Sequence, residues 1–292
     1  MTAKRLDRRR FLVGAAAGFG GLAAACDRIA ASWTGSSVLN AAESVTYCAQ
    51  RMLLGANRLA REFNDSDITP NFKSNGTENP SDKDYQLLSR NNFADWRLRV
   101  DGLVDKALDL SLSDLRALPA RTQITRHDCV EGWSCIGKWT GTPLSEVLAR
   151  VSVRAQARFV VFHCADTMEG SDDDTPDDFA APDQSASGQG KAKIRTTLDN
   201  RRIQYYESID LIDALHPQTI LAYEMNGRSL PIPHGAPLRL RVERQLGYKV
   251  AKYLMRIELV DSFARIGDGK GGYWEDRGCP CASQQNPPLD FR

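Results

Sequence analysis

The chain has 292 residues, enough for one large domain or two small ones with a substantial hydrophobic core. It carries 38 Lys and Arg against 37 Asp and Glu, and 42% of its residues are hydrophobic. This composition excludes a disordered polyanion and a globally basic nucleic-acid binder. Seven cysteines are too few for a disulfide scaffold of this length, so each one is a candidate for chemistry.

The N-terminus resembles a twin-arginine export signal. A basic cluster leads into a Gly/Ala-rich run of modest hydrophobicity, through Arg8, Arg9, Arg10, Phe11 and Leu12. We assign residues 1–31 to this signal, which predicts recognition by the twin-arginine export machinery and a periplasmic location. An uncleaved anchor helix is the alternative, although the run is weakly apolar for a membrane span. Cys26 after three alanines is a candidate lipid-attachment site.

The first half of the mature chain mixes helical and strand patterns. We expect residues 32–88 to form an extension that wraps the main domain, with a helical patch over 49–63. Periodicity and turn residues then predict a hairpin over 93–104 with its turn at Asp101-Gly102, a helix over 112–118 capped by Ser111, a strand over 123–129, a helix opened by Pro143 and a strand over 158–164.

The segment 166–197 interrupts this pattern. Its first half is acidic with no basic residue, and its second half is rich in Gly, Ser and Gln. Such a composition cannot pack as core, so we interpret the segment as an insertion. Two interpretations are open: a solvated loop, or an acidic docking surface for a positively charged partner.

The pattern after the insertion is mainly that of strands. We expect a helix from a Ser208 cap to Leu215, and strands over 219–224, 230–232, 237–242 and 253–260. Asn226-Gly227 predicts a hairpin turn between the first two of these strands. The predicted fold is therefore α+β, a single mixed, strand-rich domain with short helices over residues 89–275, followed by an irregular tail over 276–292.

Two clusters of residues are candidates for chemistry. Cys129 lies at a strand end within Arg126-His127-Asp128-Cys129-Val130-Glu131-Gly132-Trp133, where neighbouring charges would favour the thiolate. The second cluster is basic and includes His234, Arg239, Arg241, Lys249 and Lys252. Arg239 and Arg241 alternate along a strand and so share a face, which suits a bound phosphate or a heterocycle with several hydrogen bonds. A structural thiol and a solvated basic face are the alternatives.

Together these clusters resemble the molybdenum-binding domain of the sulfite oxidase family. The resemblance covers about 89–274 outside the insertion. It rests on Arg90-Asn91-Asn92-Phe93, the motif around Cys129, Leu221-Ala222-Tyr223-Glu224-Met225-Asn226-Gly227, His234-Gly235-Ala236-Pro237-Leu238-Arg239, and Gly247-Tyr248-Lys249 with Lys252. It implies a molybdenum-molybdopterin cofactor with Cys129 as the protein's metal ligand, which agrees with the preference of such metals for sulfur.

The resemblance also implies roles for other residues. Carried over position by position, the contacts to the pterin fall on Asn91, His234, Arg239, Gly247, Tyr248, Lys249 and Lys252. Arg90 aligns with an arginine that binds the substrate anion. We further expect Glu131 to act beside the metal, with Trp133 shaping solvent access, although roles in folding are equally open for both.

The resemblance implies an exported oxidoreductase that transfers an oxygen atom in a two-electron step on a small S- or N-oxide or an oxyanion. The Glu131-Gly132-Trp133 setting is closer to the branch that reduces sulfoxides, including oxidised methionine in proteins, than to animal sulfite oxidase. The sequence contains no Cys-x-x-Cys-His haem motif. The expected electron partner is therefore a membrane-bound b-type cytochrome or another haem carrier, and no nucleic acid is expected to bind.

Two rival interpretations remain open. One is an exported thiol protein without metal that uses Cys129 with Cys135. The other is a docking subunit that keeps the fold without the cofactor. The tail with Cys279-Pro280-Cys281 replaces the aromatic ending expected for the family, and a frame change in the gene is one explanation.

Overall fold

The computed structural model describes residues 58–168 and 203–277. The export signal, the acidic part of the insertion beyond 168 and the tail beyond 277 lie outside the described residues. Within these two ranges, no helix is long and apolar enough to cross a membrane.

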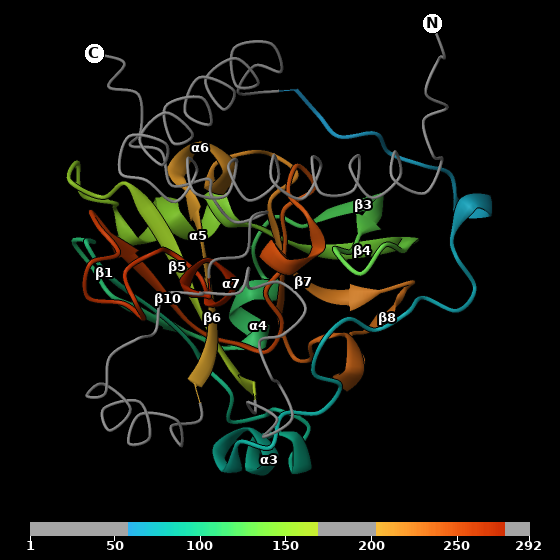
Figure 1. The fold of residues 1–292 in the computed structure, drawn as a ribbon, viewed down its shortest axis with the longest axis horizontal. Coiled ribbons are helices and arrows are strands. Elements are labelled where there is room, and N and C mark those ends of the chain that lie inside the picture. The colour runs from blue at the N-terminus through green and yellow to red at the C-terminus, as the bar shows by residue number, and fades with distance from the viewer. Residues whose placement is uncertain (1–57, 169–202, 278–292) are drawn as a thin grey trace, which may run out of the picture. The chain divides into compact units, whose positions relative to one another are not determined.

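The described strands form two five-stranded sheets (Figure 1). The first has the order β2-β1-β10-β5-β6 and is mixed, because β1 pairs in parallel with β10 while the other pairs are antiparallel. Its strands are β1 Leu98–Gly102, β2 Leu108–Leu110, β5 Phe159–Met168, β6 Ile203–Asp210 and β10 Leu254–Val260.

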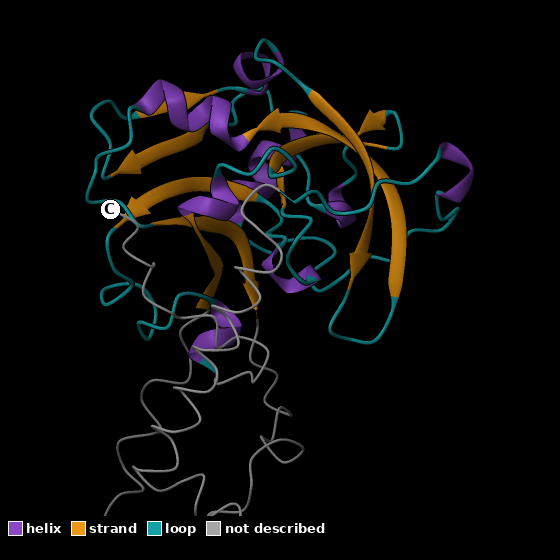
Figure 2. Cartoon of the chain, turned by 90° about the horizontal axis from the view of Figure 1, so that it is seen from above, coloured by secondary structure: helices purple, strands orange, loops and turns teal. Residues whose placement is uncertain are grey.

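The second sheet is antiparallel throughout. It runs β3-β4-β7-β8, and β9 also pairs with β7. Its strands are β3 Arg121–Asp128, β4 Ser134–Pro143, β7 Ile220–Met225, β8 Arg228–Ser229 and β9 Arg239–Arg241. Figure 2 shows the two groups of strands with loops and short helices between them.

Short helices fill the connections. They are α3 Lys83–Arg90, α4 Leu112–Arg116, α5 Leu144–Val151, α6 Leu211–Ala214 and α7 Tyr273–Asp276, with single 3-10 turns η1 Asp65–Asp67, η3 Ile232–His234 and η4 Gly247–Lys249. Ser111 caps α4 as predicted, since its hydroxyl accepts from the N–H of Asp114. The largest core cluster joins the two sheets and includes Leu98, Phe162, Leu221, Leu240 and Ile257. The α+β, strand-rich prediction is confirmed.

Residues 58–81, which we call the strap, lie across the second sheet. The N–H of Phe63 donates to the carbonyl of Ile124 at 2.9 Å, and the N–H of Thr69 donates to the carbonyl of Ile136 at 2.9 Å. The helical patch predicted over 49–63 is therefore wrong for its described residues, 58–63. Pairing with the edge strand β3 outweighs the local helical pattern there.

Three other sequence expectations need correction. Ser208 lies within β6, where its hydroxyl donates to the carbonyl of Gly271, so α6 begins later and is capped by Asp210. Gly102 belongs to β1 and not to a turn, since it pairs with Leu259 of β10, where a Cβ on residue 102 would lie 2.3 Å from the carbonyl oxygen of Leu259. Asp166, grouped with the acidic insertion, belongs to β5 and is buried.

Candidate functional site

Cys129 lies in the tight loop between β3 and β4. Its N–H donates to the carbonyl of Trp133 at 2.9 Å, and its carbonyl accepts from the N–H of Gly132 at 3.1 Å. Gly132 has a φ of 85°, a conformation that favours glycine. Burial raises the pKa of the thiol, while the backbone N–H groups of Val130 and Glu131 partly oppose the rise. The expectation that neighbouring charges favour the thiolate is therefore wrong for the free chain.

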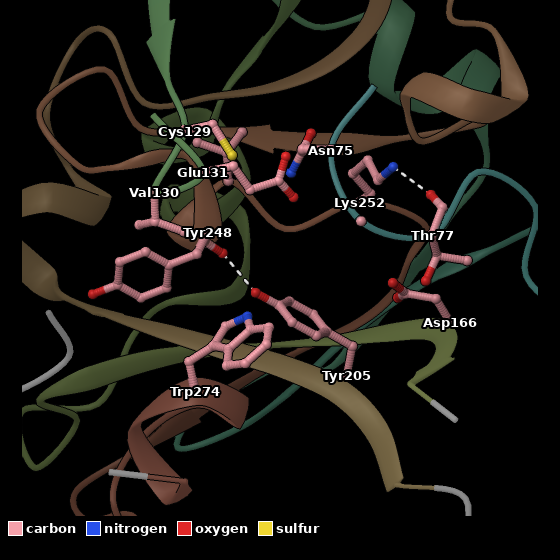
Figure 3. Close-up of a pocket in the computed structure, with 12 residues that line it drawn as sticks. Asn75, Thr77, Cys129, Val130, Glu131, Asp166, Tyr205, Tyr248, Lys252 and Trp274 are labelled. Atoms are coloured by element: carbon pink, nitrogen blue, oxygen red, sulfur yellow. Dashed lines mark hydrogen bonds between the residues drawn. The ribbon is translucent and has the colours of Figure 1, made fainter. Parts of the chain in front are cut away.

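The thiol opens onto a pocket with an empty volume of about 540 Å³ (Figure 3). Cys129, Glu131 and Asn75 lie on one side, with Tyr205 and Trp274 on the opposite side. The first sheet, the loop between β3 and β4, the strap, η4 and α7 contribute to its lining. The lining residues are Asn75, Gly76, Thr77, Cys129, Val130, Glu131, Asp166, Tyr205, Tyr248, Val250, Lys252 and Trp274.

Next to this pocket, and joined to it by Lys252, lies a basic cluster that we call the cradle, defined by His127, His234, Arg239, Arg241 and Lys252; all but the half-buried His234 are buried. The guanidinium carbons of Arg239 and Arg241 lie 4.9 and 4.5 Å from the ring centroid of Trp139. Arg241 forms a bidentate pair with Glu243, at 2.8 and 2.6 Å. Arg239 donates one Nη to the carbonyl of His234 at 2.9 Å, and its Nε and other Nη have no partner among the described residues.

The positive charge in this cradle is not balanced. Burial, and then the neighbouring Arg241, lower the pKa of Arg239 to about 9. Burial and the nearby Arg239 likewise lower the pKa of Lys252 to about 7. Lys252 donates to the carbonyls of Thr77 and Pro233, and burial raises the pKa of the neighbouring Asp166 to about 6. Buried donors without an acceptor cost free energy, so the cradle is built for an anionic or acceptor-rich ligand.

Both cradle histidines are neutral near pH 7. Burial and the surrounding cations lower the pKa of His127 to about 2 and that of His234 to about 4. The ring of Phe72, from the strap, lies 5.9 Å from that of His127 and 5.6 Å from that of His234. Gly235 supports the cradle with a φ of 105°, and a Cβ there would lie 2.9 Å from Cβ of Lys252.

Comparison with known families decides the assignment. Residues 86–265 match the family described as the oxidoreductase molybdopterin binding domain. The chain belongs to this family. The cofactor of the family is molybdenum carried by molybdopterin, and this chain is a molybdopterin-dependent oxidoreductase of the sulfite oxidase type.

Individual relatives carry related names. The chain is 34% identical over 83% of its length to a protein of Azospira oryzae provisionally named protein-methionine-sulfoxide reductase subunit YedZ1, and matches 74% of that protein. It is 34% identical over 57% of its length to the protein-methionine-sulfoxide reductase catalytic subunit MsrP of Xanthomonas campestris, matching 45% of it. It is 30% identical over 68% of its length to MsrP of Campylobacter jejuni, matching 60% of it. The matches to the two MsrP subunits thus span about half of their length.

The residues of the cradle fit the cofactor of the molybdopterin-binding family. Three buried N–H donors without partners among the described residues, on Arg239 and His127, lie beside the cationic Lys252. A ligand with several acceptor atoms and negative charge would satisfy them. Cys129, at the pocket edge, can supply the thiolate for a soft metal, because coordination deprotonates a thiol whose pKa is otherwise raised.

The structure brings together some of the predicted site residues. Cys129, Glu131, Tyr248 and Lys252 line the pocket, and His234 and Arg239 form the cradle. Gly247 contacts the cradle closely, since a Cβ on it would lie 2.6 Å from Nε2 of His127.

Other predicted residues are placed differently. Arg90 is exposed at the end of α3, and the amide of Asn91 donates to Asp95 at 2.6 Å, so neither lines the pocket. The ammonium of Lys249 is ion-paired with Glu207 and Glu275 and faces a buried acidic cluster instead. Glu131 is exposed and accepts from the indole N–H of Trp133 at 2.7 Å.

Sequence reasoning missed several site residues. His127 stands inside the motif quoted for Cys129 but was given no role, although strand alternation places it on the buried face of β3 with Gln123 and Thr125. Asp166 was assigned to the insertion, while the continued apolar run Cys164-Ala165 could have extended β5 to it. Asn75 and Thr77 carry no local signal, because only the path of the strap brings them to the pocket.

Proposed function

We propose that this oxidoreductase reduces a sulfoxide, with methionine sulfoxide in proteins as its substrate class. The carrying observation is that Cys129 lines the same pocket as Lys252, the cradle residue whose ammonium lies beside the incompletely partnered Arg239. The names of the YedZ1 and MsrP relatives support the substrate class. The reaction consumes two electrons and two protons: the sulfoxide S–O bond breaks, sulfur becomes a thioether, and the oxygen leaves as water.

The chain's residues have distinct tasks in this proposal. The cofactor, when bound, supplies a metal that accepts the oxygen atom in a two-electron step. Cys129 would hold the metal, while Arg239, His234 and Lys252 would hold the pterin through N–H donors. Asp166 is the buried acid of the pocket, and its pKa of about 6 suits it to pass protons inward near neutral pH. Trp274 and Tyr205 limit water opposite the thiol.

The proposed electron donor is a separate haem protein, for which a membrane b-type cytochrome is the expected class. We further propose that the chain acts in the periplasm after twin-arginine export. The support for export is the arginine cluster before Phe11 and Leu12. Pulse-labelling of a strain whose twin-arginine pathway is blocked tests this: retention in the cytoplasm is expected, and unchanged delivery would contradict export.

The test of the activity uses full-length protein matured in a host that makes the cofactor. With a reduced viologen as electron donor, turnover of protein-bound methionine sulfoxide is measured beside that of free methionine sulfoxide. Sulfite oxidation with ferricyanide tests the opposite direction. We expect sulfoxide reduction by the wild-type protein. Cys129→Ser should lower kcat/KM for this reaction by more than about 100-fold, because loss of a group that only hydrogen-bonds to a metal ligand already costs up to about 100-fold.

Cys135→Ser is the matched control, because Cys135 is a buried free thiol outside the pocket. Sulfite oxidation without sulfoxide reduction would contradict the proposed substrate class. Equal loss in both variants, with no molybdenum in wild-type protein, would favour the metal-free thiol protein. Absence of cofactor with both thiols dispensable would favour the docking subunit.

A further inference from the structure

His127 has one nitrogen that the fold does not use. The buried face of β3 carries Gln123, Thr125 and His127, each at most 2% exposed. Cys129 follows two positions later, in the loop that leaves the strand. The imidazole is therefore the last of this buried row, two residues before the metal ligand, and its Nε2 has no partner among the described residues.

The neighbours of His127 fix its tautomer. Nη1 of Arg241 lies 3.1 Å from Nδ1 of the imidazole, and a guanidinium can only donate, so Nδ1 accepts. Arg241 is itself held by its bidentate pair with Glu243 and by the ring of Trp139. The proton of the neutral imidazole is therefore on Nε2, which makes Nε2 a hydrogen-bond donor.

The surroundings of this donor favour an electron-rich acceptor. Phe72 and Trp133 flank the imidazole with ring centroids 5.9 and 5.5 Å away, so neither side offers an oxygen. Gly247 has no side chain, and a Cβ there would lie 2.6 Å from Nε2. The glycine thus leaves the histidine its place beside Arg239, whose Nε and one Nη also lack partners.

We propose that His127 binds the organic part of the molybdopterin cofactor by donating a hydrogen bond from Nε2. It acts as a neutral donor beside the charged donor Arg239, and Arg241 serves to orient it. The inference rests on the cofactor of the family and not on the choice of sulfoxide as substrate.

Two substitutions at His127 separate the roles of its two nitrogens. His127→Asn keeps a polar group near the Nδ1 position for Arg241 but removes the distal donor. His127→Gln keeps an N–H at the distal position. After dialysis of the matured proteins, pterin and molybdenum per folded chain are measured over time, with far-UV circular dichroism to score the fold. We expect His127→Asn to lose cofactor about tenfold faster than wild type, and His127→Gln to stay within about threefold of it.

Equal retention of pterin and molybdenum by wild type, His127→Asn and His127→Gln would overturn the proposal. Equally fast loss of cofactor from both variants, with equal loss of circular dichroism, would also overturn it, because it would indicate a structural role for His127. These readouts do not depend on any substrate, so a failed sulfoxide assay leaves them intact.

A spectroscopic measurement needs no substitution to fold. The chain has only four histidines, so ¹⁵N labelling of the imidazoles of the holoenzyme gives a simple spectrum. We expect two buried imidazoles with a protonated Nε2 and an unprotonated Nδ1, because His216 also accepts at Nδ1 from the N–H of Gln218 and faces the carbonyl of Arg58 with Nε2. Only the N–H signal of His127 should show relaxation enhancement or loss on one-electron reduction to the paramagnetic metal state. A spectrum with a single buried imidazole of this kind, or one in which reduction perturbs neither, would overturn the proposal.

Discussion

Two lysines, Lys249 and Lys252, lie close in sequence, are both buried, and have opposite electrostatic settings. Lys249 pairs with Glu207 at 2.8 Å and with Glu275, and these carboxylates raise its pKa despite burial. Lys252 shares its cradle with Arg239, and its pKa falls to about 7. One cation is neutralised within the fold, and the other is left for a ligand.

The same contrast separates Arg241 from Arg239 on the face of Trp139. Glu243 compensates the first guanidinium, whereas the second has unpartnered N–H groups in the described residues. The basic residues of this stretch therefore have two functions: Arg241 and Lys249 stabilise the fold, and Arg239 and Lys252 are available to a ligand. Partners in space, and not the type of residue, distinguish a stabilising cation from a binding one.

The largest expected effect on stability is that of Lys249→Met. It leaves Glu207 and Glu275 buried without their cation, which should lower the free energy of unfolding by about 3–5 kcal/mol. Urea denaturation at pH 7 measures this, with the exposed Lys106→Met as the matched control. A change below about 1 kcal/mol would mean that Lys249 is not the compensated lysine of the pair.

The arginine pair gives the sharpest version of the comparison. Arg241→Met leaves Glu243, 1% exposed, without its cation and should cost about 3 kcal/mol of stability. Arg239→Met removes an uncompensated cation, so unfolding should change by less than about 1 kcal/mol while retained pterin falls about tenfold. Urea denaturation and pterin fluorescence, measured on the same preparations, report both quantities. The distinction fails if the two variants behave alike.

Asp166→Asn tests the electrostatics of the pocket wall. Because the pKa of Asp166 is raised from 3.8 to about 6, its contribution to stability is complete below pH 3.8 and is lost as the pH rises through 6. The variant should therefore match wild type near pH 4 and exceed it by about 2–3 kcal/mol at pH 8. His127 and His234 titrate in both proteins, so the difference between the urea midpoints of the two proteins removes their contribution and reports Asp166 together with its neighbour Lys252. A constant difference across this range would refute the assignment.

The smallest effect is expected at the pocket rim. Glu131 is exposed and its ammonium partner Lys73 is 3.8 Å away, so Glu131→Gln should alter stability by less than about 0.5 kcal/mol. The variant keeps an acceptor for the indole N–H of Trp133. Tryptophan fluorescence should therefore stay near that of wild type, whereas Glu131→Ala should shift it. An equal shift in both variants would mean that the charge, and not the hydrogen bond, holds Trp133.

The sequence predicted those parts of the site that depend on local pattern. Strand alternation put Arg239 and Arg241 on one face, and both contact Trp139. The sequence pattern also placed the thiol of Cys129 at the end of β3. The features of the site that the sequence could not predict depend on contacts between distant segments. The ion pairs of Lys249 need Glu207 and Glu275 from β6 and α7, and the burial of Asp166 needs the neighbouring strand.

Errors in the fold have the same origin. Ser208 has the type of a helix cap, but β5 pairs with its strand and Gly271 takes its hydroxyl, so Asp210 caps the helix instead. The pattern over 58–63 favours a helix until the edge of β3 offers it hydrogen bonds. Local preference of a few tenths of a kcal/mol per residue yields to such tertiary partners.

The strap has a consequence for where the working unit begins. The family match starts at residue 86, yet the carbonyl of Thr77 accepts from both Lys252 and the hydroxyl of Tyr253, and Asn75 lies on the same side of the pocket as the thiol. A chain that began at residue 86 would keep every motif that identifies the family. It would lack Asn75, Gly76 and Thr77, and the pocket would be open to bulk water where these residues line it. Relatives that share these motifs but differ in the segment before the domain can therefore differ in which substrates enter the pocket.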